Sequence, residues 1–232
     1  MKRLVLVLAV AVLAGCGGGE HGKATLWITR DHGSHLMLDR QVPAGLTAMQ
    51  ALDRVADIKT RYGGRYVQGI NGIEGSLSAR RDWFYFINGY EADRSAAEYR
   101  LHDGDVEWWD FRSWKTQMRE PVVVGAFPEP FLHGFDGKTL PARVVYLVPE
   151  QRRAASRLAR LIGGLATRRL SVIRRKDLNV LLLEPARGRP VFLADQDRGG
   201  VPGDPVLFTF FGHAESLLRR PPIGRFHYEV QR

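Results

Sequence analysis

The side chains best suited to recognition chemistry form an aromatic group near the middle of the chain. Its members are Trp83, Tyr85, Trp108, Trp109 and Trp114. Successive side chains of an extended strand point to opposite faces, so Trp83 and Tyr85 share one face, whereas Phe84 points to the other. We expect one aromatic set to fill a core. The other set would either stack on a flat ligand or pack against another part of the chain.

Two asparagines that precede glycines, Asn71 and Asn88, add amide groups to this part of the chain. Asn-Gly pairs tolerate the positive φ of tight turns, which gives both residues a structural interpretation. Their amides also suit hydrogen bonding to the polar edge of a ligand. We therefore take four residues as the candidate ligand contacts: Trp83, Tyr85, Asn88 and Tyr90.

Patterns that would indicate a metal or a catalytic group are incomplete. His32 and His35 stand three residues apart, but a structural zinc site normally takes four ligands. Asp103 and Asp105 flank a glycine, whereas calcium needs six to eight oxygens. The segment from Asp195 begins like an EF-hand loop and lacks the acidic residue at its twelfth position. Because the sequence also has no Gly-x-Ser-x-Gly motif, we expect no metal, no cofactor and no enzymatic activity.

Residues 24–114 alternate between strand-like runs and turn signals, with one helical segment among them. Thr47 is placed to cap a helix that extends to about Ile58, because the apolar residues between them keep helical spacing. The order strand, strand, helix, strand, strand, strand favours a small mixed sheet crossed by one helix, an α+β domain of the β-grasp kind. Strands are expected at residues 24–30, 35–42, 66–73, 83–87 and 106–111.

Two segments of this region carry a resemblance to a known family. Residues 83–92 read WFYFINGYEA and residues 99–108 read YRLHDGDVEW. An aromatic strand that ends in Asn-Gly, followed by a Leu-x-x-Gly-Asp turn before the last strand, resembles the transcobalamin-like C-terminal domain family. The resemblance implies a β-grasp fold and a ligand-binding role, with cobalamin among the ligands to consider. The helical barrel that completes the cobalamin site of the animal carriers has no counterpart pattern here.

Residues 121–232 have a different sequence pattern: several prolines come first, and one helical segment among apolar strand-like segments follows. A basic amphipathic helix is expected from about Glu150 to Thr167, with arginines on its outer face. One helix among several strands favours a second small α+β domain. Its strand-like segments are residues 142–148, 170–173, 178–184, 191–194 and 206–211.

The first residues have the pattern of an exported and lipidated chain. Two basic residues precede an apolar run over residues 4–14, which is too short to span a bilayer and fits a signal peptide. The segment Leu-Ala-Gly-Cys at residues 13–16 resembles the lipobox of bacterial lipoproteins, which implies removal of residues 1–15 and lipidation of Cys16. Cys16 is the only cysteine, so no internal disulfide can form. Residues 16–23 then serve as a glycine-rich tether.

The composition fits a globular protein with a positive surface, with 44% hydrophobic residues and a formal net charge of +9. Outside the cytoplasm, this charge favours anionic headgroups or wall polymers over nucleic acid. The sequence therefore predicts a non-enzymatic, ligand-binding lipoprotein that Cys16 anchors to the cell membrane. By the resemblance, it would capture cobalamin or another small molecule for an uptake transporter. The alternative is an envelope scaffold that binds a protein partner and no small molecule.

Overall fold

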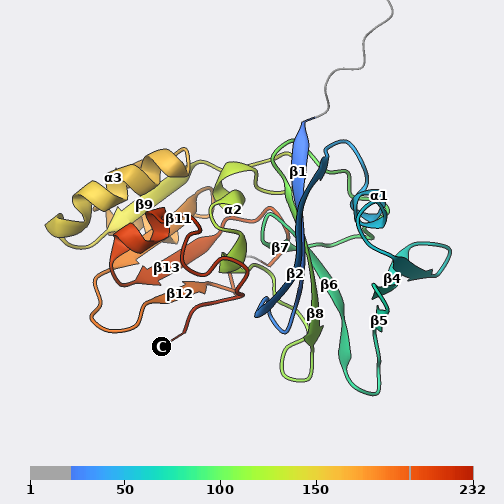
Figure 1. Cartoon of the computed structure of the whole chain (residues 1–232). Helices are drawn as coiled ribbons and strands as arrows, with labels where there is room; N and C mark the ends of the chain where they lie inside the picture. Colours follow the sequence, from blue (N-terminus) through green and yellow to red (C-terminus); the bar gives the residue numbers. More distant parts are fainter. Residues whose placement is uncertain (1–21, 199, 232) are drawn as a thin grey trace, which may run out of the picture.

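The computed structural model describes residues 22–198 and 200–231, which form an α+β fold rich in strands (Figure 1). Two five-stranded sheets stand beside each other, the first built from residues before 114 and the second from residues after 141. The predicted α+β class is confirmed. The predicted signal peptide, Cys16 and most of the tether lie outside the described residues. Among the described residues, no helix is long and apolar enough to cross a membrane.

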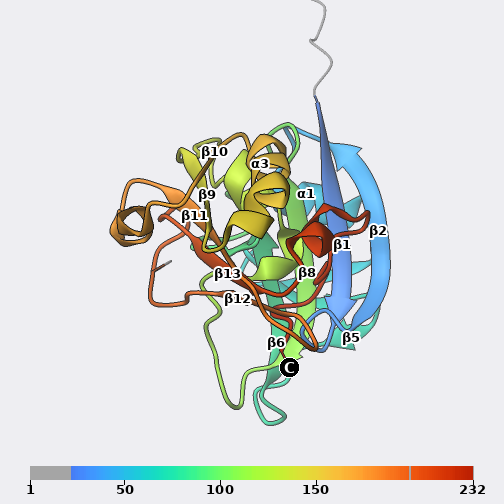
Figure 2. The same cartoon turned by 90° about the vertical axis from the view of Figure 1, so that its left-hand side faces the viewer.

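The first sheet has the strand order β2-β1-β8-β6-β7. Its central strands, β1 (Lys23–Arg30) and β8 (Val106–Ser113), run parallel, and the β2 strand (His35–Pro43) pairs antiparallel with β1. Figure 2 shows β2 at the outer edge of this sheet. On the other side of β8 lie β6 (Arg81–Ile87) and the short β7 (Tyr90–Glu91), both in antiparallel pairing. The expected hairpin and aromatic strands are thus confirmed.

The helix predicted for residues 47–58 is present but shorter than predicted. Thr47 accepts a hydrogen bond from the Gln50 amide as the N-cap, and helix α1 (Ala48–Asp53) ends well before Ile58. Beyond the helix, the Asp57 amide donates to the Asn71 side chain, 2.9 Å away. A small sheet of order β3-β4-β5 follows. Its strands are β3 (Ile58–Arg61), β4 (Tyr66–Ile70) and β5 (Ile73–Glu74). The single strand predicted for residues 66–73 is wrong, because Asn71 and Gly72 adopt positive φ and fold β5 back on β4.

The second sheet has the order β10-β9-β11-β13-β12, in which only β12 runs antiparallel to its neighbour. The predicted basic helix is shorter than expected: α3 (Arg152–Leu161) ends where Gly163 adopts a φ of 63°, the left-handed conformation common at helix C-termini. Residues beyond it form β10 instead, and residues 170–173 form a 3-10 turn rather than a strand. The strands are β9 (Ala142–Tyr146), β10 (Leu165–Thr167), β11 (Asn179–Glu184), β12 (Val191–Ala194) and β13 (Leu207–Phe211).

Short helical turns connect these strands. They are η1 (Val124–Ala126), α2 (Glu129–Leu132), η2 (Pro149–Gln151), η3 (Leu170–Arg174) and η4 (Ala214–Leu218). In Figure 1, α2 lies between the two sheets, and α3 covers the second sheet.

The last residues of the chain fill the space between the two sheets. Tyr228 packs against Phe86 and Trp108 of the first sheet, with ring centroids 5.3 and 5.6 Å away. Val230 exchanges two backbone hydrogen bonds with Phe192 of β12. A Cβ atom at Gly33 would lie 1.3 Å from the Phe226 carbonyl oxygen, so the absence of a side chain there permits this close approach. The aromatic face that includes Phe86 and Trp108 is therefore buried against the rest of the chain.

Candidate functional site

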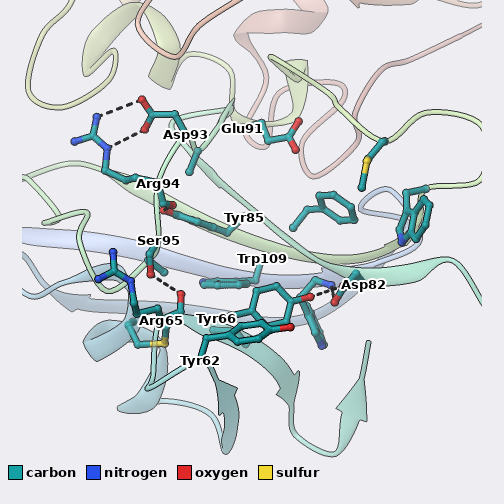
Figure 3. Close-up of a pocket in the computed structure, with 18 of the residues that line it drawn as sticks. Tyr62, Arg65, Tyr66, Asp82, Tyr85, Glu91, Asp93, Arg94, Ser95 and Trp109 are labelled. Carbon is teal, nitrogen blue, oxygen red and sulfur yellow. Dashed lines mark hydrogen bonds and ion pairs between the residues drawn. The ribbon is translucent and has the colours of Figure 1, made fainter. Parts of the chain in front are cut away.

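A cleft of about 690 Å³ opens on the other aromatic face of the first sheet (Figure 3). Its walls come from β4, β6 and β8, from the turn between β3 and β4, and from the segment of residues 91–96. Six aromatic side chains of this side line it: Tyr62, Tyr66, Trp83, Tyr85, Trp109 and Trp114. Phe84, which packs with the opposite face of the sheet, also borders it.

The centre of the cleft is a stacked pair of rings. Tyr85 and Trp109 have ring centroids 4.9 Å apart and an interplanar angle of 20°. They meet because they stand directly opposite each other in the antiparallel pairing of β6 with β8. Trp83 lies two residues earlier on the same face, where its indole N–H donates to the Ile73 carbonyl at 2.8 Å and ties β5 to β6. Trp83 and Trp109 are nearly buried, at 5% and 3% exposed, and Tyr85 is partly buried, so these rings form the packed floor of the cleft.

A second aromatic wall is provided by the turn between β3 and β4. Tyr62 and Tyr66 have ring centroids 6.0 Å apart in an edge-to-face arrangement. The Tyr66 hydroxyl donates to the Asp82 carboxylate, and burial raises the pKa of Tyr66 well above its usual value. Tyr62 is 77% exposed, so its ring is available at the mouth of the cleft.

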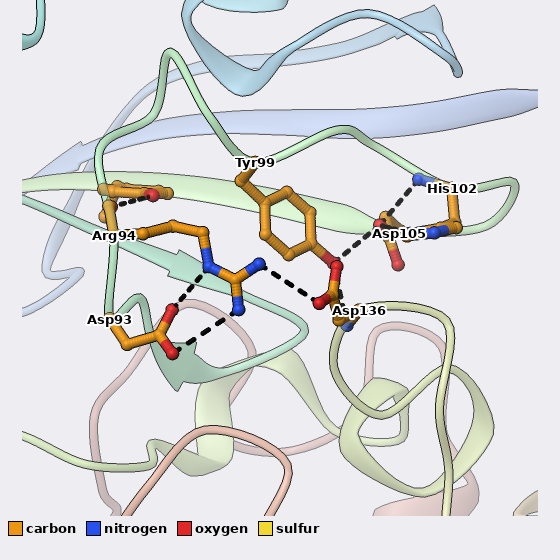
Figure 4. Close-up of polar contacts among 7 residues, drawn as sticks. Asp93, Arg94, Tyr99, His102, Asp105 and Asp136 are labelled. Carbon is orange, nitrogen blue, oxygen red and sulfur yellow. Dashed lines mark hydrogen bonds and ion pairs between the residues drawn. The ribbon is translucent and has the colours of Figure 1, made fainter.

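Charged groups at the rim of the cleft are paired with one another (Figure 4). The Arg94 guanidinium donates to Asp93 at 2.8 Å and to Asp136 at 3.1 Å. It also lies 5.9 Å from the centroid of the Tyr99 ring, within the range of a cation–π contact. Ser95 donates to the Arg65 carbonyl and so joins this rim to the β3–β4 turn. The paired rim leaves the cleft with aromatic faces and little free charge.

A buried carboxyl group supports the stacked rings from behind. Glu107 is fully buried, and its Oε1 accepts the indole N–H of Trp109 at 2.5 Å. Its Oε2 has no hydrogen-bond partner among the described residues. Burial raises the pKa of Glu107 well above its usual value.

The four residues expected to contact a ligand have two different placements. Trp83 and Tyr85 line the cleft. Asn88 is completely buried instead: its Nδ2 donates to Asp105 at 2.7 Å and to the Gly134 carbonyl at 3.0 Å. Tyr90 is 1% exposed, and its hydroxyl donates to the Asp204 carbonyl at 3.2 Å. Both side chains hold the two halves of the chain together, so we do not keep them as ligand contacts.

Several cleft residues were not predicted from the sequence because they lie outside the aromatic strands. Tyr62 and Tyr66 flank Gly63 and Gly64, and tyrosines around a glycine turn are the signal that could have indicated them. Leu77 and Met118 come from loops and are 81% and 62% exposed. No sequence pattern distinguishes these two from other loop residues.

Residues of the incomplete metal patterns make other contacts in the structure. The His32 backbone amide donates to Asp110, and its ring packs edge-to-face on Tyr228 at 5.0 Å. The Asp105 carboxylate accepts bonds from Asn88, Tyr99 and the His102 amide. Within the described residues, no group of three or more His, Cys, Asp or Glu side chains is arranged to hold a metal ion.

A smaller polar hollow, of about 420 Å³, lies between the two halves of the chain. Residues of the first half, including His32 and Ser34, face Gln196 and His227 of the second half across it. Glu120 lies there too, and burial raises its pKa to about 7.

Comparison with known protein families finds a match over part of the chain. A family model described as "Domain of unknown function (DUF4430)" matches residues 45–113, inside the stretch that resembles the transcobalamin-like domain. No curated protein sequence matches the chain.

Two solved structures show a partial likeness at 14% sequence identity each. One is a "putative metal binding protein" from Ruminococcus gnavus ATCC 29149, with a TM-score of 0.33 over 40% of this chain and 97% of that one. The other is haptocorrin in complex with Cbi, with a TM-score of 0.31 over 45% of this chain and 29% of that one. The chain therefore spans less than a third of the haptocorrin chain.

Proposed function

We propose that this protein is a non-enzymatic, extracytoplasmic lipoprotein that binds a small molecule in its aromatic cleft. The observation that carries the proposal is the stacked pair Tyr85–Trp109 at the centre of a cleft of about 690 Å³. Ligand sites of soluble proteins commonly have volumes of about 300–1,000 Å³ and predominantly apolar, aromatic walls.

The lining of the cleft favours a flat or ring-shaped organic molecule with polar groups at its edge. Aromatic rings such as those of Tyr85 and Tyr62 attract flat apolar faces. The rim offers hydrogen-bonding groups, but its guanidinium is already paired with Asp93 and Asp136, so a large net charge on the ligand is not required. A corrinoid belongs among the compounds to be tested because of the sequence resemblance, and transfer to an uptake transporter would follow capture.

Binding can be tested by thermal unfolding of residues 17–232 with a panel of corrinoids, porphyrins and aromatic metabolites. A ligand present at 100 times its dissociation constant should stabilise the protein by about 2.7 kcal/mol. We expect Tyr62→Ala to weaken binding several-fold without loss of folding, because Tyr62 is 77% exposed. Leu170→Ala, at a position that is 54% exposed and outside the cleft, is the matched control.

Two results would count against this proposal. If no compound of the panel shifts the unfolding temperature, the small-molecule function loses its support. If a compound binds and Tyr62→Ala and Leu170→Ala retain the same affinity, the site is not the aromatic cleft.

The proposed membrane anchor is tested separately through Cys16. Cys16→Ser removes the sulfur that would carry the lipid, so the protein should leave the membrane fraction or stop at the precursor stage. A Cys16→Ser protein that is processed normally and still sediments with membranes would show that another feature holds it there.

A second candidate function is docking of a protein partner on the same cleft. Tyr62, Leu77 and Met118 are 77%, 81% and 62% exposed and all lie at the cleft; exposed apolar side chains that gather in this way are typical of interaction sites. Capture of a stoichiometric partner from detergent-solubilised membranes, lost with Leu77→Glu and kept with Leu170→Glu, would support this function over the first.

A further inference from the structure

The outer face of helix α3 carries a row of exposed arginines. Ala154, Ala155 and Leu158 are buried toward the second sheet, which leaves the opposite face of the helix to charged side chains. We call this face, together with two arginines of the segment beside it, the α3 arginine surface. It consists of Arg152, Arg153, Arg157, Arg160, Arg219 and Arg220, all exposed.

The arginines of the two segments meet at a groove. A hollow of about 520 Å³ is lined by Arg157 and Arg160 of α3 and by Arg219 and Arg220. Its remaining walls are mostly apolar and include Leu161. Guanidinium groups around an apolar groove suit a ligand that has both an anionic group and a hydrocarbon part.

Much of the positive charge of this surface is not neutralised. Arg157 pairs with Glu215 at 2.8 Å, but both side chains are about half exposed, at 49% and 53%, and exposed pairs of this kind are weak. For the other five arginines, no ion pair occurs within the described residues. Two leucines at this side of the protein are also exposed, Leu161 at 37% and Leu165 at 64%.

The position of the α3 arginine surface relative to the start of the described chain suggests what it contacts. In both Figure 1 and Figure 2, α3 and the start of β1 lie toward the top of the molecule, and Figure 1 shows α3 at the left and β1 near the middle. Only seven residue steps separate Lys23 from Cys16, and seven residues span at most about 25 Å when fully extended. A lipid on Cys16 would therefore keep the start of β1 close to the bilayer, whereas Figure 1 places β4, which lines the cleft, far from α3.

We propose that the α3 arginine surface docks on the anionic phospholipid headgroups of the membrane that holds the protein. Arginine binds phosphate through two parallel hydrogen bonds, and basic residues near an anionic bilayer each strengthen association roughly fivefold. Docking orients the body so that the cleft faces away from the bilayer. The orientation rests on the proposed anchor at Cys16, but attraction to anionic lipid does not require the anchor.

The proposal is tested with unlipidated residues 17–232, which keep every residue that the structure describes. We expect this protein to co-sediment with vesicles that contain phosphatidylglycerol and not with vesicles of pure phosphatidylcholine. The triple variant Arg152→Glu, Arg153→Glu, Arg160→Glu should bind anionic vesicles at least tenfold more weakly. The matched control Arg61→Glu, Arg80→Glu, Lys115→Glu changes the net charge equally at exposed positions outside the α3 arginine surface and should retain most of the binding.

Three outcomes would overturn the docking proposal. One is no binding to anionic vesicles at physiological salt, where the Debye length of about 8 Å still permits contact attraction. Another is an equal loss of binding in both triple variants, which would reflect net charge alone. The third is binding to a soluble anionic polymer such as poly(glycerol phosphate) without binding to vesicles. Unchanged ligand-induced stabilisation in the α3 variant separates this test from that of the cleft.

Discussion

The indole ring of Trp109 joins a stacking contact in the cleft to a hydrogen bond in the protein interior. One face of the ring stacks on Tyr85 at a centroid distance of 4.9 Å, while its Nε1 donates to Glu107 at 2.5 Å. The position of the stacked pair therefore depends on a buried carboxyl group that a ligand does not reach.

Replacement of Trp109 by Phe should lower the free energy of unfolding by about 2–4 kcal/mol. The change removes the donor to Glu107, which leaves a buried acceptor unsatisfied at a cost of about 1–3 kcal/mol, and also leaves a small cavity. Urea unfolding of Trp109→Phe, Glu107→Leu and the double variant measures the coupling. We expect Trp109→Phe to cost less when Glu107 is already Leu. Strictly additive effects would show that the hydrogen bond contributes nothing.

The stability difference between Glu107→Gln and the native protein should depend on pH. The folded carboxyl holds its proton more tightly than the unfolded one, because burial raises its pKa well above the value of 4.5 for an exposed group. The free energy of unfolding therefore falls as the pH rises above about 4.5, until the pH passes the raised pKa. Glutamine has no such proton, so the advantage of Glu107→Gln should grow from pH 4.5 to pH 7.5 in urea unfolding. A constant difference over this range would contradict the raised pKa of Glu107.

Asn88→Ala should destabilise the protein by roughly 3 kcal/mol and leave the ligand affinity of the folded fraction unchanged. Asn88 makes three hydrogen bonds, to Asp105, to the Gly134 carbonyl and from the Val106 amide, and each contributes about 1 kcal/mol. Chemical denaturation measures the first effect and ligand titration the second. A stable Asn88→Ala protein with weaker ligand binding would restore Asn88 to the contact set.

Removal of residues 224–232 should expose the aromatic face of the first sheet. Tyr228 is 7% exposed in the intact chain and covers Phe86 and Trp108, so its loss leaves large apolar rings in water. We expect a lower unfolding temperature and binding of the dye ANS. Deletion of residues 231–232 alone is the control and should have neither effect. A truncated chain that melts at the native temperature without binding ANS would show that the second half is not needed to complete the first sheet.

Local sequence patterns predicted most of the first sheet because they act over a few residues. The alternation of Trp83, Phe84 and Tyr85 placed one aromatic set on each face, and the structure has this arrangement. Element ends were less predictable. Helix α3 stops before Gly163, and the pair Gly163-Gly164 could have indicated this end. The helical spacing of apolar residues continues to Leu165, so the predicted helix was too long.

The candidate site was predicted only where it lies on strands. Trp83 and Tyr85 belong to β6, whose alternation is visible in the sequence. Tyr62, Leu77 and Met118 line the same cleft from loops that tertiary packing brings together. No local sequence pattern indicates such packing. Asn88 and Tyr90 were expected at the ligand because their types suit it, yet their partners lie 46 and 114 residues away in the sequence. Such distant pairing decides whether a polar side chain faces a ligand or the interior.

The placement of Tyr228 on the first sheet has a consequence for the order in which the protein can mature. A chain that is synthesised or translocated from its N-terminus presents all strands of the first sheet, which end at Ser113, long before residue 228 appears. Until then, the face with Phe86 and Trp108 is covered only in part, by residues such as Val123 and Ala126. The aromatic face of the first sheet therefore cannot reach its final packing until the segment with Tyr228 has been synthesised.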